Sequence, residues 1–166
     1  IRIRLGTTGF VINNCKFEGV TAAGATGVVY VNGVEAQITS CTFASHTNVP
    51  LYVADPVNVA VVESRFEGNN TYTSGFTGAG VYAALTASSV LNPRLTFTDC
   101  QFVNNRTKFY GAAVSIWGHN NLPADWTVTF SNCLFDGNKT GFDDLGNPPP
   151  AVPSIGSGFG GAVYAM

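Results

Sequence analysis

The chain has 166 residues, of which 45% are hydrophobic and only 11% are charged, and its net charge is −2. This length suits one domain, and the charged fraction is well below the roughly 25% of an ordinary soluble domain. The sequence has no Lys/Arg cluster to hold nucleic acid or an acidic membrane, and no apolar run near the roughly 18 residues that a membrane helix needs. Nineteen glycines and twelve phenylalanines favour strands and turns over helices.

In chain order, the first expected strand is the alternating stretch 1–5 and the last is 161–166. Both ends of the sequence therefore fall inside a strand pattern. We expect residues 1–166 to form a single β-domain that is a fragment of a longer chain or one protomer of a filament.

Between these ends one phrase recurs five times: alternating apolar residues, polar residues, a small residue, one variable residue and Phe. The copies cover residues 10–17, 36–43, 59–66, 95–102 and 128–135 and end on Phe17, Phe43, Phe66, Phe102 and Phe135. A second phrase, Gly or Pro followed by alternating apolar residues, lies between them. It aligns residues 29, 51, 81, 114 and 163 in one apolar column and Tyr30, Tyr52, Tyr82, Ser115 and Tyr164 in the next.

These repeats predict the fold. No single copy can bury its apolar face alone, so the copies must stack, each one contacting its neighbours. The phenylalanines are 26, 23, 36 and 33 residues apart, which indicates a coil of constant perimeter from which loops of variable length leave. A sandwich would have no reason to repeat one phrase in register. We predict an all-β, right-handed parallel β-helix of about five coils, with long loops at 70–78, 84–94, 117–126 and 139–159.

Two motifs carry a resemblance to known proteins. Phe-x-x-Asn occurs at residues 66–69, 102–105 and 135–138, and Gly-Gly-Ala-Val-Tyr occurs at 160–164. Together they resemble the repeats of chlamydial-type polymorphic outer-membrane proteins and, more widely, the pectate-lyase-like right-handed β-helix superfamily. Residues 17–20 and 43–46 lack the Asn, so the first two coils depart from the pattern. The resemblance implies this fold and display on or beyond a cell surface, but it does not choose between passengers, adhesins and enzymes.

The same Asn opens a glycosylation sequon in all three copies: Asn69-Asn70-Thr71, Asn105-Arg106-Thr107 and Asn138-Lys139-Thr140. Two interpretations stay open. Either Asn69, Asn105 and Asn138 form a ladder that satisfies backbone groups at a turn, or they carry glycans that coat one edge of the solenoid.

Four cysteines occupy the small-residue position of the first phrase, and Ser64 holds that position in the third copy. Adjacent coils would bring Cys15 near Cys41, and Cys100 near Cys133, within the Cα separation of a disulfide. The alternative is a ladder of buried thiols, since free Cys packs as a small hydrophobe. The spacing is not that of a zinc site.

No constellation of catalytic groups stands out. His119 precedes the acidic pair Asp143-Asp144 in the chain and is followed by Asn120. In a polygalacturonase-like site, a type found in the superfamily that the chain resembles, the histidine comes after the carboxylates and is followed by Gly. The side chains considered for acid–base work or calcium binding, and set aside as solvated turn residues, are Arg94, Arg106, His119, Asp136, Asp143 and Asp144. His46 is expected in a loop without a partner. We predict no catalytic site, no metal and no cofactor.

Two loop features remain as candidates for contact. Trp117 and Trp126 flank an expected excursion and are candidates for sugar contacts, although paired aromatics also seal a loop onto the body of a protein. The stretch 147–154 is rich in proline and predicts a polyproline II segment, which is either a contact arm or a stiff surface loop.

The expected ends carry neither an amphipathic capping helix nor a charged edge strand, and uncapped strand edges invite head-to-tail stacking. We therefore predict a non-catalytic extracellular structural protein, a glycosylated β-solenoid segment of a fibre, sheath or cell-surface adhesin that self-associates end to end. We expect no nucleic-acid partner. The alternative is a fragment of a polysaccharide-degrading or polysaccharide-binding β-helix protein.

Overall fold

The computed structural model describes residues 1–3, 9–21, 27–71, 78–85, 92–118, 126–141 and 162–165. Every regular element within these residues is a β-strand. Sheet A consists of β1 (Arg2–Ile3), β4 (Val29–Asn32), β7 (Leu51–Ala54), β10 (Val81–Leu85), β14 (Val114–Gly118) and β18 (Val163–Ala165). Sheet B consists of β2 (Phe10–Asn13), β5 (Glu35–Thr39), β8 (Asn58–Val62), β11 (Arg94–Thr98) and β15 (Thr127–Ser131).

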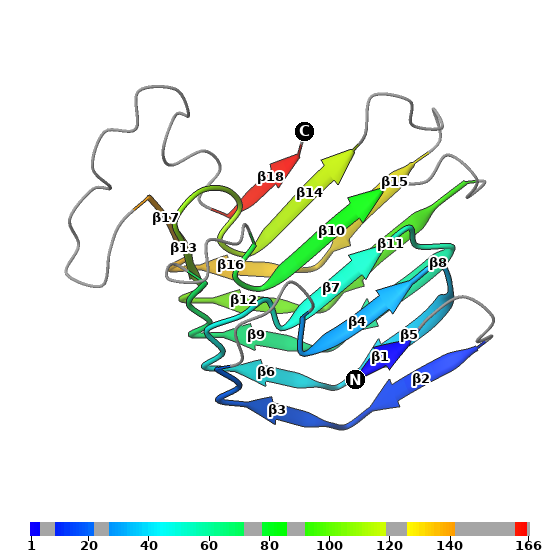
Figure 1. Ribbon diagram of the computed structural model, residues 1–166, viewed down its shortest axis with the longest axis horizontal. Coiled ribbons are helices and arrows are strands. Elements are labelled where there is room, and N and C mark those ends of the chain that lie inside the picture. Colours follow the sequence, from blue (N-terminus) through cyan, green and yellow to red (C-terminus); the bar gives the residue numbers. More distant parts are fainter. Residues whose placement is uncertain are drawn as a thin grey trace.

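Two further sheets complete the circuit. Sheet C consists of β3 (Lys16–Glu18), β6 (Thr42–Ala44), β9 (Arg65–Glu67), β12 (Gln101–Val103) and β16 (Leu134–Asp136). Sheet D pairs β13 (Arg106–Thr107) with β17 (Lys139–Thr140). All pairings are parallel and follow chain order, so each turn of the chain adds one strand to sheets A, B and C (Figure 1). This arrangement confirms the predicted all-β parallel solenoid.

The registers confirm the predicted columns. In sheet A, Val29 pairs with Leu51, and the column continues through residues 81, 114 and 163. The tyrosine column is its neighbour, with Ser115 between Tyr82 and Tyr164. In sheet C, the five repeat phenylalanines pair with one another in sequence order.

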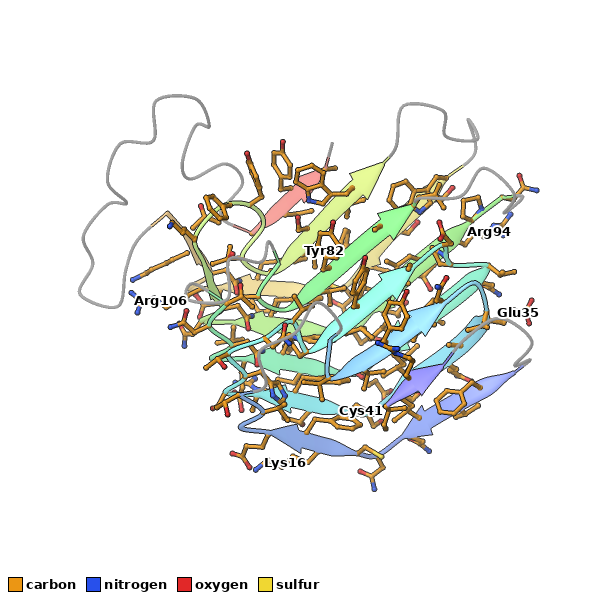
Figure 2. All side chains as sticks on the ribbon, in the orientation of Figure 1. Lys16, Glu35, Cys41, Tyr82, Arg94 and Arg106 are labelled. Carbon is orange, nitrogen blue, oxygen red and sulfur yellow. The ribbon has the colours of Figure 1, made fainter. Side chains whose placement is uncertain are left out.

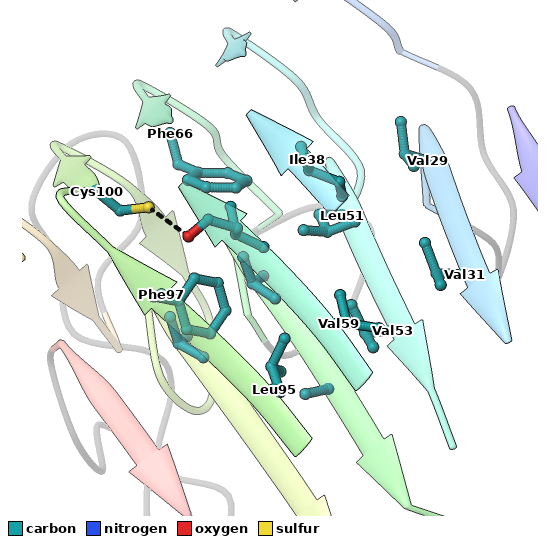
Figure 3. Close-up of a cluster of buried hydrophobic side chains, with 14 of the residues drawn as sticks. Val29, Val31, Ile38, Leu51, Val53, Val59, Phe66, Leu95, Phe97 and Cys100 are labelled. Carbon is teal, nitrogen blue, oxygen red and sulfur yellow. Dashed lines mark hydrogen bonds between the residues drawn. The ribbon is translucent and has the colours of Figure 1, made fainter. Parts of the chain in front are cut away.

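The interior holds the inward-facing side chains of all three large sheets. The repeat phenylalanines stack almost parallel, with ring centroids 4.9, 4.8, 5.1 and 4.9 Å apart along the column. Figure 3 shows part of the core, where Leu51 of sheet A and Val59 and Leu95 of sheet B project into one interior. Burying one such side chain contributes roughly 1.5–3 kcal/mol. The repeat therefore supplies its own core.

Every described coil bends at two corners, and at each corner one residue has the left-handed backbone conformation, with positive φ. The first lies between sheets B and C, and the second lies after sheet C. The first corner is formed by Asn14, Ser40, Glu63, Asp99 and Asn132, with φ between 48° and 54°. The second is formed by Gly19, Ser45, Gly68, Asn104 and Gly137, with φ between 55° and 66°. Gly and Asn adopt this conformation most readily, which explains the turn residues that separate the repeated phrases.

The glycine that opens the second phrase is required by close backbone approach. A Cβ at Gly80 would lie 2.4 Å from the carbonyl oxygen of Ala113 in the next coil. A Cβ at Gly111 would lie 2.1 Å from the carbonyl oxygen of Val114, and Gly111 also has φ of +51°. Neither position accommodates a side chain without moving the backbone.

Candidate functional site

A buried asparagine ladder follows sheet C. Asn69 and Asn105 have 0% exposed surface, and Asn138 is half-buried. The amide of Asn69 donates to the carbonyl oxygen of Phe43 at 3.1 Å and to Oδ1 of Asn105 at 2.9 Å. The amide of Asn105 donates in the same way to Phe66 and to Asn138, both at 2.9 Å. The ladder thus joins consecutive coils by side-chain bonds.

His46 occupies the ladder position in the second coil, although we expected a loop residue without a partner. It is fully buried. Its Nδ1 lies 3.1 Å from the backbone nitrogen of Val20, and its Nε2 lies 3.1 Å from the carbonyl oxygen of Phe17. Nδ1 must accept and Nε2 must donate, which defines a neutral imidazole. Burial lowers the pKa of His46, opposed by the Phe17 hydrogen bond and by the charge of Glu18.

The four cysteines form the predicted column, and the structure holds all four as free thiols. Cys41 and Cys100 are buried, Cys133 is half-buried and Cys15 is exposed. The sulfur of Cys100 lies 3.3 Å from the carbonyl oxygen of Thr98 and 3.4 Å from that of Val61, and Figure 3 draws one hydrogen bond from this thiol as a dashed line. Burial raises the pKa of Cys41, and it raises that of Cys100 to about 11.

An aromatic face covers the outside of sheet A. Tyr30, Tyr52 and Tyr82 lie half-buried on consecutive strands, with edge-to-face ring centroids 5.0 and 4.9 Å apart. Burial raises the pKa of Tyr52 to about 12, with further contributions from Tyr82, Tyr30 and Asp55. Figure 2 labels Tyr82 on this face.

The face continues beyond Ser115. Tyr110 stacks on Tyr164 at 4.6 Å and meets Trp117 edge-on at 5.6 Å. The indole nitrogen of Trp117 donates to the hydroxyl of Ser115 at 3.0 Å, which fixes the ring on the sheet. We define the aromatic face as Tyr30, Tyr52, Tyr82, Tyr110, Trp117 and Tyr164. Its six side chains are half-buried and lie on or beside sheet A, and we take this face as the candidate site.

A family model described as a right handed beta helix region matches residues 8–149. The chain belongs to the right-handed beta helix family. No curated protein and no solved structure gave a match. The predicted right-handed β-helix is thereby confirmed, whereas the finer resemblance to the pectate-lyase-like superfamily stays a hypothesis. The narrower resemblance, to chlamydial-type outer-membrane proteins, stays a hypothesis.

The geometry of the β-helix favours the ladder over glycans at two of the three sequons. At Asn69 and Asn105 both hydrogens of the side-chain amide are donated to other groups inside the protein. Thr71 and Thr107, the hydroxyl residues of these sequons, are also fully buried. A glycan on either amide nitrogen would displace the ladder bonds.

The two tryptophans lie in different environments of the β-helix. Trp117 belongs to the aromatic face. Trp126 instead packs against the core, and its indole nitrogen is buried with no hydrogen-bond partner among the described residues. Only Trp117 keeps its candidacy for sugar contact.

The charged candidates are scattered. Arg94 begins β11 and Arg106 lies on β13 beside Lys139, at opposite sides of the molecule in Figure 2. Asp136 ends β16, whereas His119, Asp143, Asp144 and the stretch 147–154 lie outside the described residues. Within the described ranges, no three His, Cys, Asp or Glu side chains gather as metal ligands, and no helix is long and apolar enough to span a membrane.

Proposed function

We propose that this β-helix is a non-catalytic structural protein of the cell exterior, a rigid segment of a fibre, sheath or cell-surface adhesin that assembles end to end. One observation carries the proposal: the phenylalanine stack and the asparagine ladder run through successive coils without changing register. Every coil is therefore tied to the next by both apolar and polar contacts, which is what a load-bearing rod needs. The resemblance to surface-protein repeats adds support for an extracellular place.

The C-terminal coil supports the assembly step. Strands β15, β16 and β18 are the outermost members of their sheets. Beside them, an apolar cavity of about 500 Å³ is lined by Ile116, Trp126, Val128, Phe130, Val163 and Ala165. These are inward-facing or core-packed positions, so a further coil stacked on them would extend the columns. A second copy that stacks head to tail supplies such a coil and, because the contact does not close on itself, yields a filament.

Negative-stain electron microscopy and sedimentation over a range of protein concentrations test the proposal. We expect filaments in the parent protein and none in a Val128→Asp variant, which places a charge in the apolar cavity. The matched control is Ala60→Asp, because Ala60 is half-buried on β8, the central strand of sheet B, and lies at neither end of the solenoid. Circular dichroism checks that both variants fold. Monodisperse monomers of the parent protein at every concentration would contradict end-to-end assembly.

A second candidate, a polysaccharide-binding passenger, is favoured by the aromatic face. Tyr and Trp rings combine an apolar surface with polar groups at the rim, and sugars offer both kinds of contact. Affinity electrophoresis in gels containing neutral or acidic polysaccharides tests this function. Tyr52→Ala should abolish any retardation, whereas Val11→Ala, an apolar truncation on another sheet, should leave it unchanged.

A further inference from the structure

The cysteine column contains two neighbouring pairs and one interruption. The backbone nitrogen of Thr42 donates to the carbonyl oxygen of Cys15 at 2.9 Å, and Leu134 donates to Cys100 in the same way at 2.9 Å. Cys15 and Cys41 therefore lie on adjacent coils, as do Cys100 and Cys133. Ser64 occupies the coil between the pairs, where its hydroxyl donates to the carbonyl oxygen of Val62 at 2.9 Å.

The thiols of each pair point the same way. Every Sγ lies 3.2–3.4 Å from the carbonyl oxygen two residues earlier in its own coil. The Ser64 hydroxyl contacts the equivalent carbonyl oxygen, that of Val62. Burial is the main cause of the raised pKa of Cys41 and of Cys100, and the charge of the neighbouring cysteine, Cys15 or Cys133, raises it further.

Spacing decides which cysteines can join. Adjacent parallel strands lie about 4.8 Å apart, which is inside the Cα range of roughly 4.4–6.8 Å for a disulfide. Cys41 and Cys100 are two coils apart, about 10 Å, which exceeds that range. The folded chain therefore contains two pairs of cysteines that can be oxidised to disulfides, and Ser64 lies in the coil between the two pairs.

We propose that Cys15–Cys41 and Cys100–Cys133 are two redox-active dithiol pairs, which a small disulfide oxidant converts into disulfides that fasten neighbouring coils together. The proposal goes beyond the structural function and does not depend on filament assembly. Under this proposal the column is a thiol ladder when reduced and two disulfides when oxidised, so each interpretation of the sequence applies to one redox state.

The chemistry is a pair of thiol–disulfide exchanges. The thiolate of the more exposed cysteine, Cys15 or Cys133, attacks one sulfur of oxidised glutathione, forms a mixed disulfide and releases one glutathione thiolate. The thiolate of Cys41 or Cys100 then attacks the protein sulfur of that mixed disulfide and releases the second glutathione. Two protein thiols are oxidised, one glutathione disulfide is reduced to two thiols, and two protons leave the protein. The raised pKa of the buried thiols makes the second attack slow.

The bonds should be reversible. Because the side chains of each pair are parallel, their Cβ atoms stay near the strand spacing of about 4.8 Å, whereas a relaxed disulfide has Cβ atoms about 3.8 Å apart. Closing this gap strains the bond, and strained disulfides are reduced more readily than structural ones.

The test incubates the native chain in buffers of graded oxidised and reduced glutathione, followed by acid quenching, alkylation and peptide mass spectrometry. We expect a Cys15–Cys41 link and a Cys100–Cys133 link in oxidising buffers, both lost again in excess reduced glutathione. Four alkylated thiols, or glutathione adducts alone, in the most oxidising buffer would overturn the proposal. Links that survive excess reduced glutathione would overturn its reversible character.

A double variant supplies the control. Cys15→Ser with Cys133→Ser leaves only Cys41 and Cys100, on opposite sides of Ser64, and should form no internal link while folded. Serine is a suitable replacement because Ser64 already occupies this column with the same hydrogen bond. Circular dichroism confirms folding, and the same variant in denaturant should form the link, which shows that the reagents work. A Cys41–Cys100 link in the folded variant would contradict the spacing argument.

Discussion

His46 and Asn69 are joined by a hydrogen bond of 3.1 Å from the backbone nitrogen of His46 to Oδ1 of Asn69. His46 repeats that bond one coil earlier, where its Nδ1 accepts from the backbone nitrogen of Val20 at 3.1 Å. Its Nε2 meets the carbonyl oxygen of Phe17, as the amide nitrogen of Asn69 meets that of Phe43. The imidazole therefore replaces an asparagine, with one difference: it can take up a proton.

Protonation of His46 should destabilise the first two coils. A proton on Nδ1 removes the acceptor that Val20 uses and places a charge in a fully buried site. Since the pKa of the folded state lies below the ordinary value of 6.5, the unfolded chain binds the proton first. Stability should be complete above pH 6.5 and fall below it by up to about 1.4 kcal/mol per pH unit, until the pKa of the folded state is passed. Urea unfolding at several pH values measures this slope.

His46→Asn is the matched variant for that experiment. An asparagine here can accept from Val20 and donate to Phe17, as its counterparts do in later coils, and it does not titrate. We expect the variant to fold and to lose the part of the pH dependence that begins near 6.5. An unchanged slope in the variant would assign the pH dependence to other groups.

Asn105 should be the costliest ladder residue to remove. Its replacement by Ala leaves the buried amide of Asn69 and the buried carbonyl of Phe66 without their partners. Each unsatisfied buried group costs about 1–3 kcal/mol, so we expect a loss of about 4 kcal/mol in the free energy of unfolding. Asn138→Ala is the comparison: it also leaves the amide of Asn105 without its acceptor, but removing the half-buried Asn138 opens that amide to water, so it should cost less than Asn105→Ala. Equal losses would argue against burial as the cause.

The repeated phrases were sufficient to predict the coils, since Phe43 and Phe66 pair where the sequence aligned them. They could not predict His46, because a different side chain completes the ladder there. The signal was nonetheless present: His46 follows Phe43 at the spacing that separates Asn69 from Phe66. The aromatic face was predicted only as a tyrosine column, because the contact of Tyr110 with Tyr164 joins residues that share no phrase. Burial of the sequon asparagines was undecidable from sequence, since a turn residue can point inward or outward.

Secretion through a eukaryotic host should give folded protein without glycans on Asn69 and Asn105. Their amide nitrogens are buried and bonded, so a chain that carries a glycan there cannot close the ladder. Peptide mass spectrometry of the secreted, folded fraction measures occupancy. A double variant, Val11→Asn with Asn13→Thr, is the positive control, because it creates a sequon at two exposed positions of β2. A glycan on Asn69 in protein with an unchanged circular dichroism spectrum would contradict the ladder.

Glu63 offers a stabilising substitution at the first left-handed corner. Its φ is 48°, and the same corner is filled by Asn14 in the first coil and by Asn132 in the last. A Glu in this conformation is strained, whereas Asn adopts it readily. We expect Glu63→Asn to raise stability by about 0.5–1 kcal/mol, measured as a higher urea midpoint with an unchanged slope. The lost carboxylate accepts only an exposed hydrogen bond from Ser40, so its removal costs little. Glu63→Gln is the control, because it removes the charge but keeps a side chain that adopts this φ poorly, and it should leave stability nearly unchanged. An equal gain in Glu63→Gln would assign the effect to the charge and not to the corner.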